Sequence, residues 1–419
     1  MPGHETTHAT DSIASVNHDS AARDEGFQNF TRMQIAAVML IGVLTSLVVV
    51  LQPLLLGPFA AEGRLTLSEM GQTAMLEALG MAIAVAGGGA LFTPRKLRTI
   101  IVAAVVTSVI ANGVTTFVQH ELVLAARFVN GLSVGVLLWV WTGLVTRVAL
   151  PARPLAFFLV LQTSGALAVS WLLSTFVMPY IGAPGGYACL AGASALGIFL
   201  AGYAPSEYCL LPSNNTVRFQ LPGGIGFFGL LAVLVHQAGI MAFWVYVLPL
   251  GREKGLTEAF VASAVTASLV AQIAGGMCAT IFARLHAKTA LYASVAASLV
   301  GLYLVGTAND QWTFVGGVVI IVFFWMFAPA YQMPYLLEVD PSRRAGMQMI
   351  TAQLLGLSAG PAIASLFVLA GHVGPALAVS GSLYLIAAIL ILVTTSLRRT
   401  SPARIDIHRK ARPNGSATY

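Results

Sequence analysis

The sequence predicts an all-α membrane protein of about twelve transmembrane helices, arranged as two six-helix bundles related by a pseudo-two-fold axis. Three observations support this fold class. Hydrophobic residues make up 57% of the 419 residues and charged residues only 9%, whereas a soluble domain carries roughly 25% charged residues. Apolar runs long enough to cross about 30 Å of hydrocarbon recur along the chain. Finally, basic loops repeat at matching positions in the two halves.

Polar breaks between the apolar runs divide the chain into expected spans. In the first half these are 33–60, 68–92, 98–118, 121–147, 155–180 and 184–204. In the second half they are 223–250, 256–282, 288–306, 312–338, 346–370 and 374–397. We therefore expect five regions: a disordered cytoplasmic tail over 1–32, an N-terminal bundle over 33–204, a cytoplasmic loop over 205–222, a C-terminal bundle over 223–397 and a basic cytoplasmic tail over 398–419.

The distribution of basic residues sets the expected orientation, because cytoplasmic loops carry an excess of Lys and Arg. With the N-terminus inside, Arg64, Arg252 and Lys254 fall outside and Arg127 lies within a span, which leaves 18 of the 22 Lys and Arg on the cytoplasmic side. We expect a multi-pass protein of the inner (plasma) membrane with both termini cytoplasmic. The basic tail is expected to contact anionic lipid of the bilayer, and the clustering of basic residues in loops argues against a nucleic-acid partner.

The basic loops repeat in register between the halves. Arg95 lies 62 residues after position 33 and Arg284 lies 61 after position 223, while Arg153 and Arg343 each lie 120 after the same two positions. Parallel duplication of this kind is typical of transporters built from two six-helix halves.

Two loop copies and one span carry motif-like residues. The first loop runs from Gly89 to Arg98 and keeps a glycine and a basic end, and the second keeps its basic residues but has Ala283 in place of an acid. The motif residues in these cytoplasmic loops are Gly89, Arg95, Lys96, Arg98, Arg284 and Lys288. The fourth span contains Arg127-Phe-Val-Asn-Gly131. In topology and in these degenerate motifs, residues 33–397 resemble the major facilitator superfamily, whose loop pattern is Gly-x-x-x-Asp-Arg/Lys-x-Gly-Arg/Lys-Arg/Lys and whose fourth span carries Arg-x-x-x-Gly. The resemblance implies two bundles that rock about a central substrate site.

Two charged residues lie within the expected spans, where one charge costs about 2.5–3.5 kcal/mol. Glu77 in the second span and Arg127 in the fourth both lie roughly 9–14 Å below the outer end of their helices, so they are placed to pair. Asn130 shares a helical face with Arg127, and both are candidates for substrate binding. In one interpretation Arg127 binds an anionic substrate and Glu77 carries a coupling proton. In the other, Arg127 braces the N-terminal bundle by bonding Glu77 or a carbonyl.

Other polar residues at mid-depth are candidates for substrate binding. His236 lies near the middle of the seventh span and is a candidate for both proton coupling and substrate binding, although a buried histidine bonded only to a neighbour fits equally. The remaining substrate-binding candidates are Gln52, Gln162, Gln237, Gln272, Trp325 and Gln353. Each also fits a role in helix packing.

No residue pattern supports a metal, a cofactor or an enzyme. The match His4-Glu-Thr-Thr-His8 to a zinc-protease motif falls in a polar tail that lacks a helix and a third ligand, and the three cysteines have no paired spacing. The spans contain no paired His or paired Asp at helical spacing that would suggest catalysis. We therefore expect no cofactor, no metal and no enzymatic activity.

The leading functional hypothesis is a secondary active transporter that moves a small organic solute by alternating access, with H+ as the coupling ion and an organic anion as the symported substrate. The alternative in the same class is efflux of hydrophobic or drug-like compounds by proton antiport. The alternative from another class is a non-transporting membrane sensor or scaffold.

Overall fold

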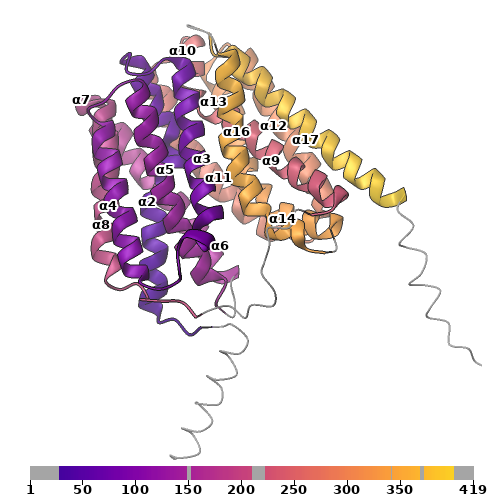
Figure 1. Ribbon diagram of the computed structural model, residues 1–419. Coiled ribbons are helices and arrows are strands. Elements are labelled where there is room, and N and C mark those ends of the chain that lie inside the picture. The colour runs from indigo at the N-terminus through magenta and orange to yellow at the C-terminus, as the bar shows by residue number, and fades with distance from the viewer. Residues whose placement is uncertain (1–27, 149–151, 210–221, 341, 369–371, 401–419) are drawn as a thin grey trace, which may run out of the picture.

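The computed structural model describes residues 28–148, 152–209, 222–340, 342–368 and 372–400, and this part of the chain contains helices and no strand. The expected tail over 1–32 and the basic tail over 398–419 therefore lie almost wholly outside the described residues, as does most of the loop over 205–222. The helices fall into two sets that follow one another along the chain (Figure 1).

The first set holds the helices up to residue 201. They are α2 (Arg32–Ala61), α3 (Leu67–Leu91), α4 (Leu97–Thr115), α5 (Glu121–Val145), α6 (Ala152–Leu172), the π-helical η1 (Leu173–Val177), α7 (Met178–Ile181) and α8 (Ala183–Ala201). Threonine caps begin two of them, because the side chains of Thr31 and Thr66 each accept a hydrogen bond from the backbone three residues later.

The second set holds the helices from residue 224 onward. They are α9 (Gly224–Trp244), α10 (Val247–Glu253), α11 (Glu258–Ile281), α12 (Ala287–Thr307), α13 (Gln311–Phe327), α14 (Pro329–Val339), α15 (Arg344–Met347), α16 (Met349–Phe367) and α17 (Gly374–Thr400). The span expected over 312–338 is not one straight helix, since α13 and α14 meet at 46°. Pro329 opens α14 and lacks the N–H that would continue the helix.

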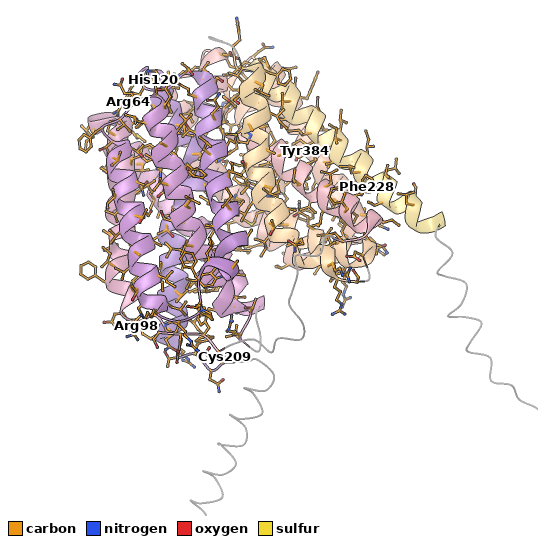
Figure 2. All side chains as sticks on the ribbon, viewed as in Figure 1. Arg64, Arg98, His120, Cys209, Phe228 and Tyr384 are labelled. Atoms are coloured by element: carbon orange, nitrogen blue, oxygen red, sulfur yellow. The ribbon has the colours of Figure 1, made fainter. Side chains whose placement is uncertain are left out.

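Eleven described helices are long and apolar enough to cross a membrane, or twelve when α13 and α14 count as one bent span. The predicted fold class, an all-α membrane protein of about twelve spans, is therefore confirmed. The molecule is a multi-pass membrane protein. We call the end at which α2 begins and α8 ends the terminal face, and the other end the opposite face; Figure 2 shows Arg98 and Cys209 at the first and Arg64 and His120 at the second.

Hydrogen bonds join the two sets toward the opposite face. Near the start of α3 and the end of α16, the Ser68 hydroxyl donates to the Ser365 carbonyl (3.0 Å). Further along the same helix pair, the Ser358 hydroxyl donates to the Met75 carbonyl (3.0 Å). Helices α3 and α16 thus form the main contact between the sets, and both of these hydrogen bonds run from a hydroxyl to a carbonyl.

Two further contacts complete this junction, which we call the seam. The Trp244 indole Nε1 at the end of α9 donates to the Val50 carbonyl of α2 (3.2 Å). The hydroxyls of Ser170 in α6 and Thr266 in α11 lie 2.6 Å apart. Toward the terminal face the sets diverge, and α17 slants away from the first set (Figure 1). The described molecule is therefore closed at the opposite face.

Candidate functional site

A buried ion pair lies within the first set. Arg127 Nη2 of α5 is 3.2 Å from Glu77 Oε1 of α3, and the two side chains are 0% and 1% exposed. Nη2 is not aligned for a hydrogen bond at this distance. The Asn130 amide Nδ2 does donate to Glu77 Oε1 (2.8 Å). The structure thus brings Glu77, Arg127 and Asn130 together, in agreement with the similar depths in the membrane that the sequence predicts for Glu77 and Arg127.

The glycine that follows Asn130 explains how α3 and α5 approach so closely. A Cβ added at Gly131 would overlap the carbonyl of Glu77, well inside van der Waals contact. Only hydrogen at this position allows the two backbones to touch. The pair therefore depends on the Arg-x-x-x-Gly spacing itself.

Residues from α4 and α8 complete this network. Arg127 Nη1 donates to the Asn112 side-chain oxygen (2.8 Å), and the guanidinium lies 4.9 Å from the ring centre of Tyr187. The Ser108 hydroxyl donates to the Asn130 side-chain oxygen (2.8 Å), which orients that amide toward Glu77. All of these partners of the Arg127 guanidinium belong to the first set. This is the geometry expected if Arg127 braces the N-terminal bundle. Sequence reasoning did not select Asn112, Ser108 or Tyr187; polar residues four apart in the third span were the available signal for the first two.

His236 lies in a second buried polar site, within the second set. It is 2% exposed, its two ring nitrogens have no hydrogen-bond partner among the described residues, and its ring meets that of Tyr384 edge-on at 5.4 Å. A cavity of about 10 Å³ beside it is lined by Gln332 and Tyr335, among others, which is room for about one water molecule. Gln332 Oε1 accepts a hydrogen bond from Gln353 Nε2 (2.7 Å), so Gln353 bonds a residue that lines the same cavity as His236.

Four buried glutamines have side-chain atoms without a hydrogen-bond partner among the described residues: both amide atoms of Gln52, Oε1 of Gln237, Oε1 of Gln272 and Nε2 of Gln332. Such groups are costly unless a ligand or water satisfies them. Gln52 follows Val50 by two residues and Gln272 follows Thr266 by six, so both lie within about 3–9 Å of the seam along their helix axes. Their unpartnered atoms lack only a hydrogen-bond partner, which a water molecule or a solute would supply.

The remaining predicted residues have protein partners. Trp325 packs edge-on against Trp244 at a ring-centre distance of 5.4 Å, which places an aromatic pair beside the seam. Gln162 Nε2 donates to the Ser46 hydroxyl (2.7 Å) inside the first set. The Gln162 Nε2 therefore has a protein partner.

No protein-family model and no curated protein matches this sequence. Solved structures do match it. The nucleoside transporter NupG superposes with a TM-score of 0.69 at 11% identity, covering 87% of this chain and 100% of that one. The chain has the major facilitator fold.

Two sugar transporters share this fold with the chain. The xylose transporter XylE from E. coli, in a partially occluded inward-open form, superposes with a TM-score of 0.68 at 14% identity, covering 86% of this chain and 97% of that one. The E. coli fucose:proton symporter FucP gives a TM-score of 0.58 at 13% identity, covering 86% of this chain and 98% of that one. This similarity establishes the fold. The site residues are identified from the geometry of this chain and not from the similar structures.

The loop residues of this major facilitator fold lie at the terminal face. Arg95, Lys96, Arg98 and Arg284 are exposed. Arg98 Nε donates to the Ala204 carbonyl (2.8 Å), which ties the first loop to the end of α8. In the second copy Lys288 forms an ion pair with Glu338 (2.6 Å). Gly89 borders a cavity at the same face. Within the described residues no ion pair joins the two loops.

Proposed function

We propose that this protein is a secondary active transporter that moves a small organic solute by alternating access. The observation that carries the proposal is the seam: hydrogen bonds close the two helix sets at the opposite face, while the sets diverge at the terminal face. A transporter of two rocking halves requires such a one-sided closure. With both termini in the cytoplasm, the described state is the inward-facing one. The structures that share the fold, NupG, XylE and FucP, are themselves transporters.

The proposed substrate is an uncharged polar ring compound. The positive charge of Arg127 is already paired with Glu77, so it is not available to an organic anion. The unpartnered hydrogen-bonding atoms near the seam include amide atoms of Gln52 and Gln272, and the Trp244–Trp325 pair lies beside the same seam. Amides with an aromatic surface suit a hydroxyl-bearing ring. The nucleoside, xylose and fucose named for the three structures belong to this class.

The proposed coupling ion is H+, carried by Glu77. This carboxylate is buried and lies on α3, the same helix that holds Ser68 and Met75 of the seam. Protonation would remove the charge that holds Arg127 and would loosen α3 against α5. Proton binding and opening of the seam are thereby linked through one helix, with about 2.3 kcal/mol per charge per 100 mV of membrane potential to drive the cycle.

Replacing Gln272 with leucine is the test of the substrate site. We expect counterflow of uncharged nucleosides or monosaccharides in proteoliposomes to fall by about tenfold or more, because a lost hydrogen bond of about 1.4 kcal/mol has that effect on affinity. The melting temperature should stay the same or rise, since the substitution removes an unsatisfied buried amide. Gln162→Leu is the matched control, and we expect it to keep transport and lower stability. Counterflow of organic acids alone would refute the proposed substrate class.

The coupling role is tested by changing both charges together. In Glu77→Gln with Arg127→Gln the network stays polar, so we expect solute counterflow to persist and accumulation under an imposed pH gradient to disappear. A pH-sensitive dye trapped in the vesicles would report the loss of solute-triggered proton movement. Undiminished pH-driven accumulation in this double variant would exclude Glu77 as the proton carrier.

A further inference from the structure

A cavity of about 370 Å³ opens at the terminal face of the first set, a volume typical of ligand pockets. One wall is the end of α3, where Val85, Gly89 and Phe92 follow one another at helical spacing. The other wall is the end of α5, with Trp139 and Arg147. Neither the buried ion-pair network nor the seam uses these residues, so the cavity is a separate feature of the fold.

Arg147 supplies the charge among the described residues that line this cavity. It is 8% exposed, its Nε donates to the Cys209 carbonyl (2.9 Å), and its Nη1 donates to the Gly143 carbonyl (2.7 Å). Nη2 of the same guanidinium has no hydrogen-bond partner in the part of the chain that the structure describes. A buried arginine therefore lines the cavity with N–H donors still unused.

No described side chain neutralises this cation. Arg147 forms no ion pair within the described residues, and the acid nearest to its partners in sequence, Glu207, is exposed. The Tyr208 ring centre lies 5.0 Å from the guanidinium, but burial raises the pKa of Tyr208 and the opposing effect of Arg147 does not reverse the shift. The Tyr208 hydroxyl donates to the Val140 carbonyl (2.8 Å) as a neutral phenol. A cation this deeply buried is costly without a counter-charge, so the cavity suits an anionic ligand.

The aromatic residues of the wall place the cavity at the edge of the membrane. Trp139 lies six residues before Val145, the last residue of α5, which is about 9 Å along the helix axis. Its ring packs against that of Phe92 with the ring centres 5.7 Å apart. Tryptophan and tyrosine are enriched at this depth, where lipid headgroups meet acyl chains. Leu91, next to Phe92, is 73% exposed and offers an acyl chain an apolar surface just outside the cavity.

Further positive charge lies at the rim of the cavity. Pro94 lines the cavity and its carbonyl accepts a hydrogen bond from the Tyr208 N–H (2.9 Å), so the loop after α3 is tied to the wall. Arg95 and Lys96 follow Pro94 directly, and both are exposed. Basic pockets between membrane-spanning helices bind anionic lipid headgroups. This site therefore suits a headgroup with a net negative charge better than a zwitterionic one, whose own cation would be repelled.

We propose that this cavity binds the headgroup of an anionic phospholipid, with the phosphate on Nη2 of Arg147. The rings of Trp139 and Phe92 lie beside the glycerol region of the lipid, and an acyl chain follows Leu91. These side chains are different from the unpartnered glutamines near the seam, so the lipid is a ligand distinct from the transported solute. Its binding does not depend on the proposed transport function.

Native mass spectrometry of the full-length protein, delipidated in detergent, measures the binding. We expect the wild type to bind phosphatidylglycerol with higher affinity than phosphatidylcholine. In Arg147→Gln the affinity for phosphatidylglycerol should fall by about tenfold or more, because a hydrogen bond to a charged group is lost. Arg284→Gln is the matched control. It removes the same charge from an exposed residue of the same face, outside the cavity, and should keep the affinity of the wild type.

A second pair of variants leaves Arg147 in place, so the test does not depend on the folding of Arg147→Gln. Thr146 lines the cavity and is exposed. Thr146→Glu adds a carboxylate to the cavity that holds the guanidinium, where it would compete with the phosphate, and we expect it to weaken phosphatidylglycerol binding. Thr146→Gln adds a side chain of the same length without the charge, and we expect it to bind as the wild type does.

Equal affinities of the wild type, Arg147→Gln and Thr146→Glu for phosphatidylglycerol would overturn the proposal. An equal loss in Arg284→Gln would also overturn it, because the lipid would then respond only to the general positive charge of this face. Glycerol 3-phosphate tests the source of the anion. If it displaces phosphatidylglycerol from the wild type at equal concentration, the site recognises a soluble phosphate and the assignment to a lipid is wrong. Lipid that stays bound supports the contribution of the acyl chain.

Discussion

Glu77→Ala is expected to lower the free energy of unfolding by about 3–5 kcal/mol, because removing one partner of a buried ion pair leaves the other charge uncompensated. The residue left behind is Arg127, which is 0% exposed and whose Nη2 and Nε have no hydrogen-bond partner among the described residues. The change also removes the acceptor of the Asn130 amide. Thermal unfolding in detergent, followed by tryptophan fluorescence, measures the effect.

Two controls separate the loss of the charge pair from a general sensitivity of the fold. Adding Arg127→Met to Glu77→Ala removes the orphaned cation and should recover most of the lost stability. Glu338→Ala removes a carboxylate from the partly exposed pair with Lys288, and we expect a change of about 1 kcal/mol or less. Equal losses in the free energy of unfolding for Glu77→Ala and Glu338→Ala would show that burial does not increase the contribution of the Arg127 pair to stability.

Gly131→Val should be at least as damaging, since its side chain would enter the space held by the backbone of Glu77. We expect a loss of more than about 3 kcal/mol, at the upper end of overpacking costs, because the obstructing atoms belong to backbone and cannot turn aside. Separation of α3 from α5 would also pull Asn130 away from its acceptor. The yield of folded, monodisperse protein and its melting temperature would both fall.

Gly192→Val is the matched control for this substitution. Gly192 also lies within a membrane-spanning helix, α8, but a Cβ there would meet no atom within 4 Å. We expect its melting temperature to stay close to that of the wild type. If Gly131→Val were tolerated as well as Gly192→Val, the close approach of α3 and α5 would be wrong.

Much of the fold followed from hydropathy alone. The first expected span, 33–60, differs from α2 (Arg32–Ala61) by a single residue at each end, because a long apolar run between polar residues leaves few alternatives. The break within the tenth span was not predicted. Pro329 was visible in the sequence, but prolines also lie inside continuous helices here, as Pro53 and Pro58 do in α2, so the residue type alone does not locate a bend.

The candidate site was predictable only in part. Depth along two helices placed Glu77 beside Arg127, since distance from the helix end converts directly into height in the membrane. Which other helices surround the pair does not follow from the sequence, because these spans are apolar on every side and give no face that marks a neighbour. Asn112 and Tyr187 were missed for this reason. His236 was selected as a single polar residue, but Gln332, which lines the same cavity and bonds Gln353, lies on another helix.

The seam also has a chemistry suited to repeated opening. When Ser358 leaves the Met75 carbonyl, its hydroxyl can turn back to a carbonyl of its own helix, as helical serines and threonines commonly do. The Thr266 hydroxyl already donates to a carbonyl of its own helix, that of Ala262 (3.0 Å), while it contacts Ser170. The indole of Trp244 has no such fallback, because a tryptophan N–H does not reach the backbone of its own turn. Of these three groups, Trp244 Nε1 is therefore the one that needs a new acceptor when the halves part, and a solute oxygen arriving beside Trp325 would supply it.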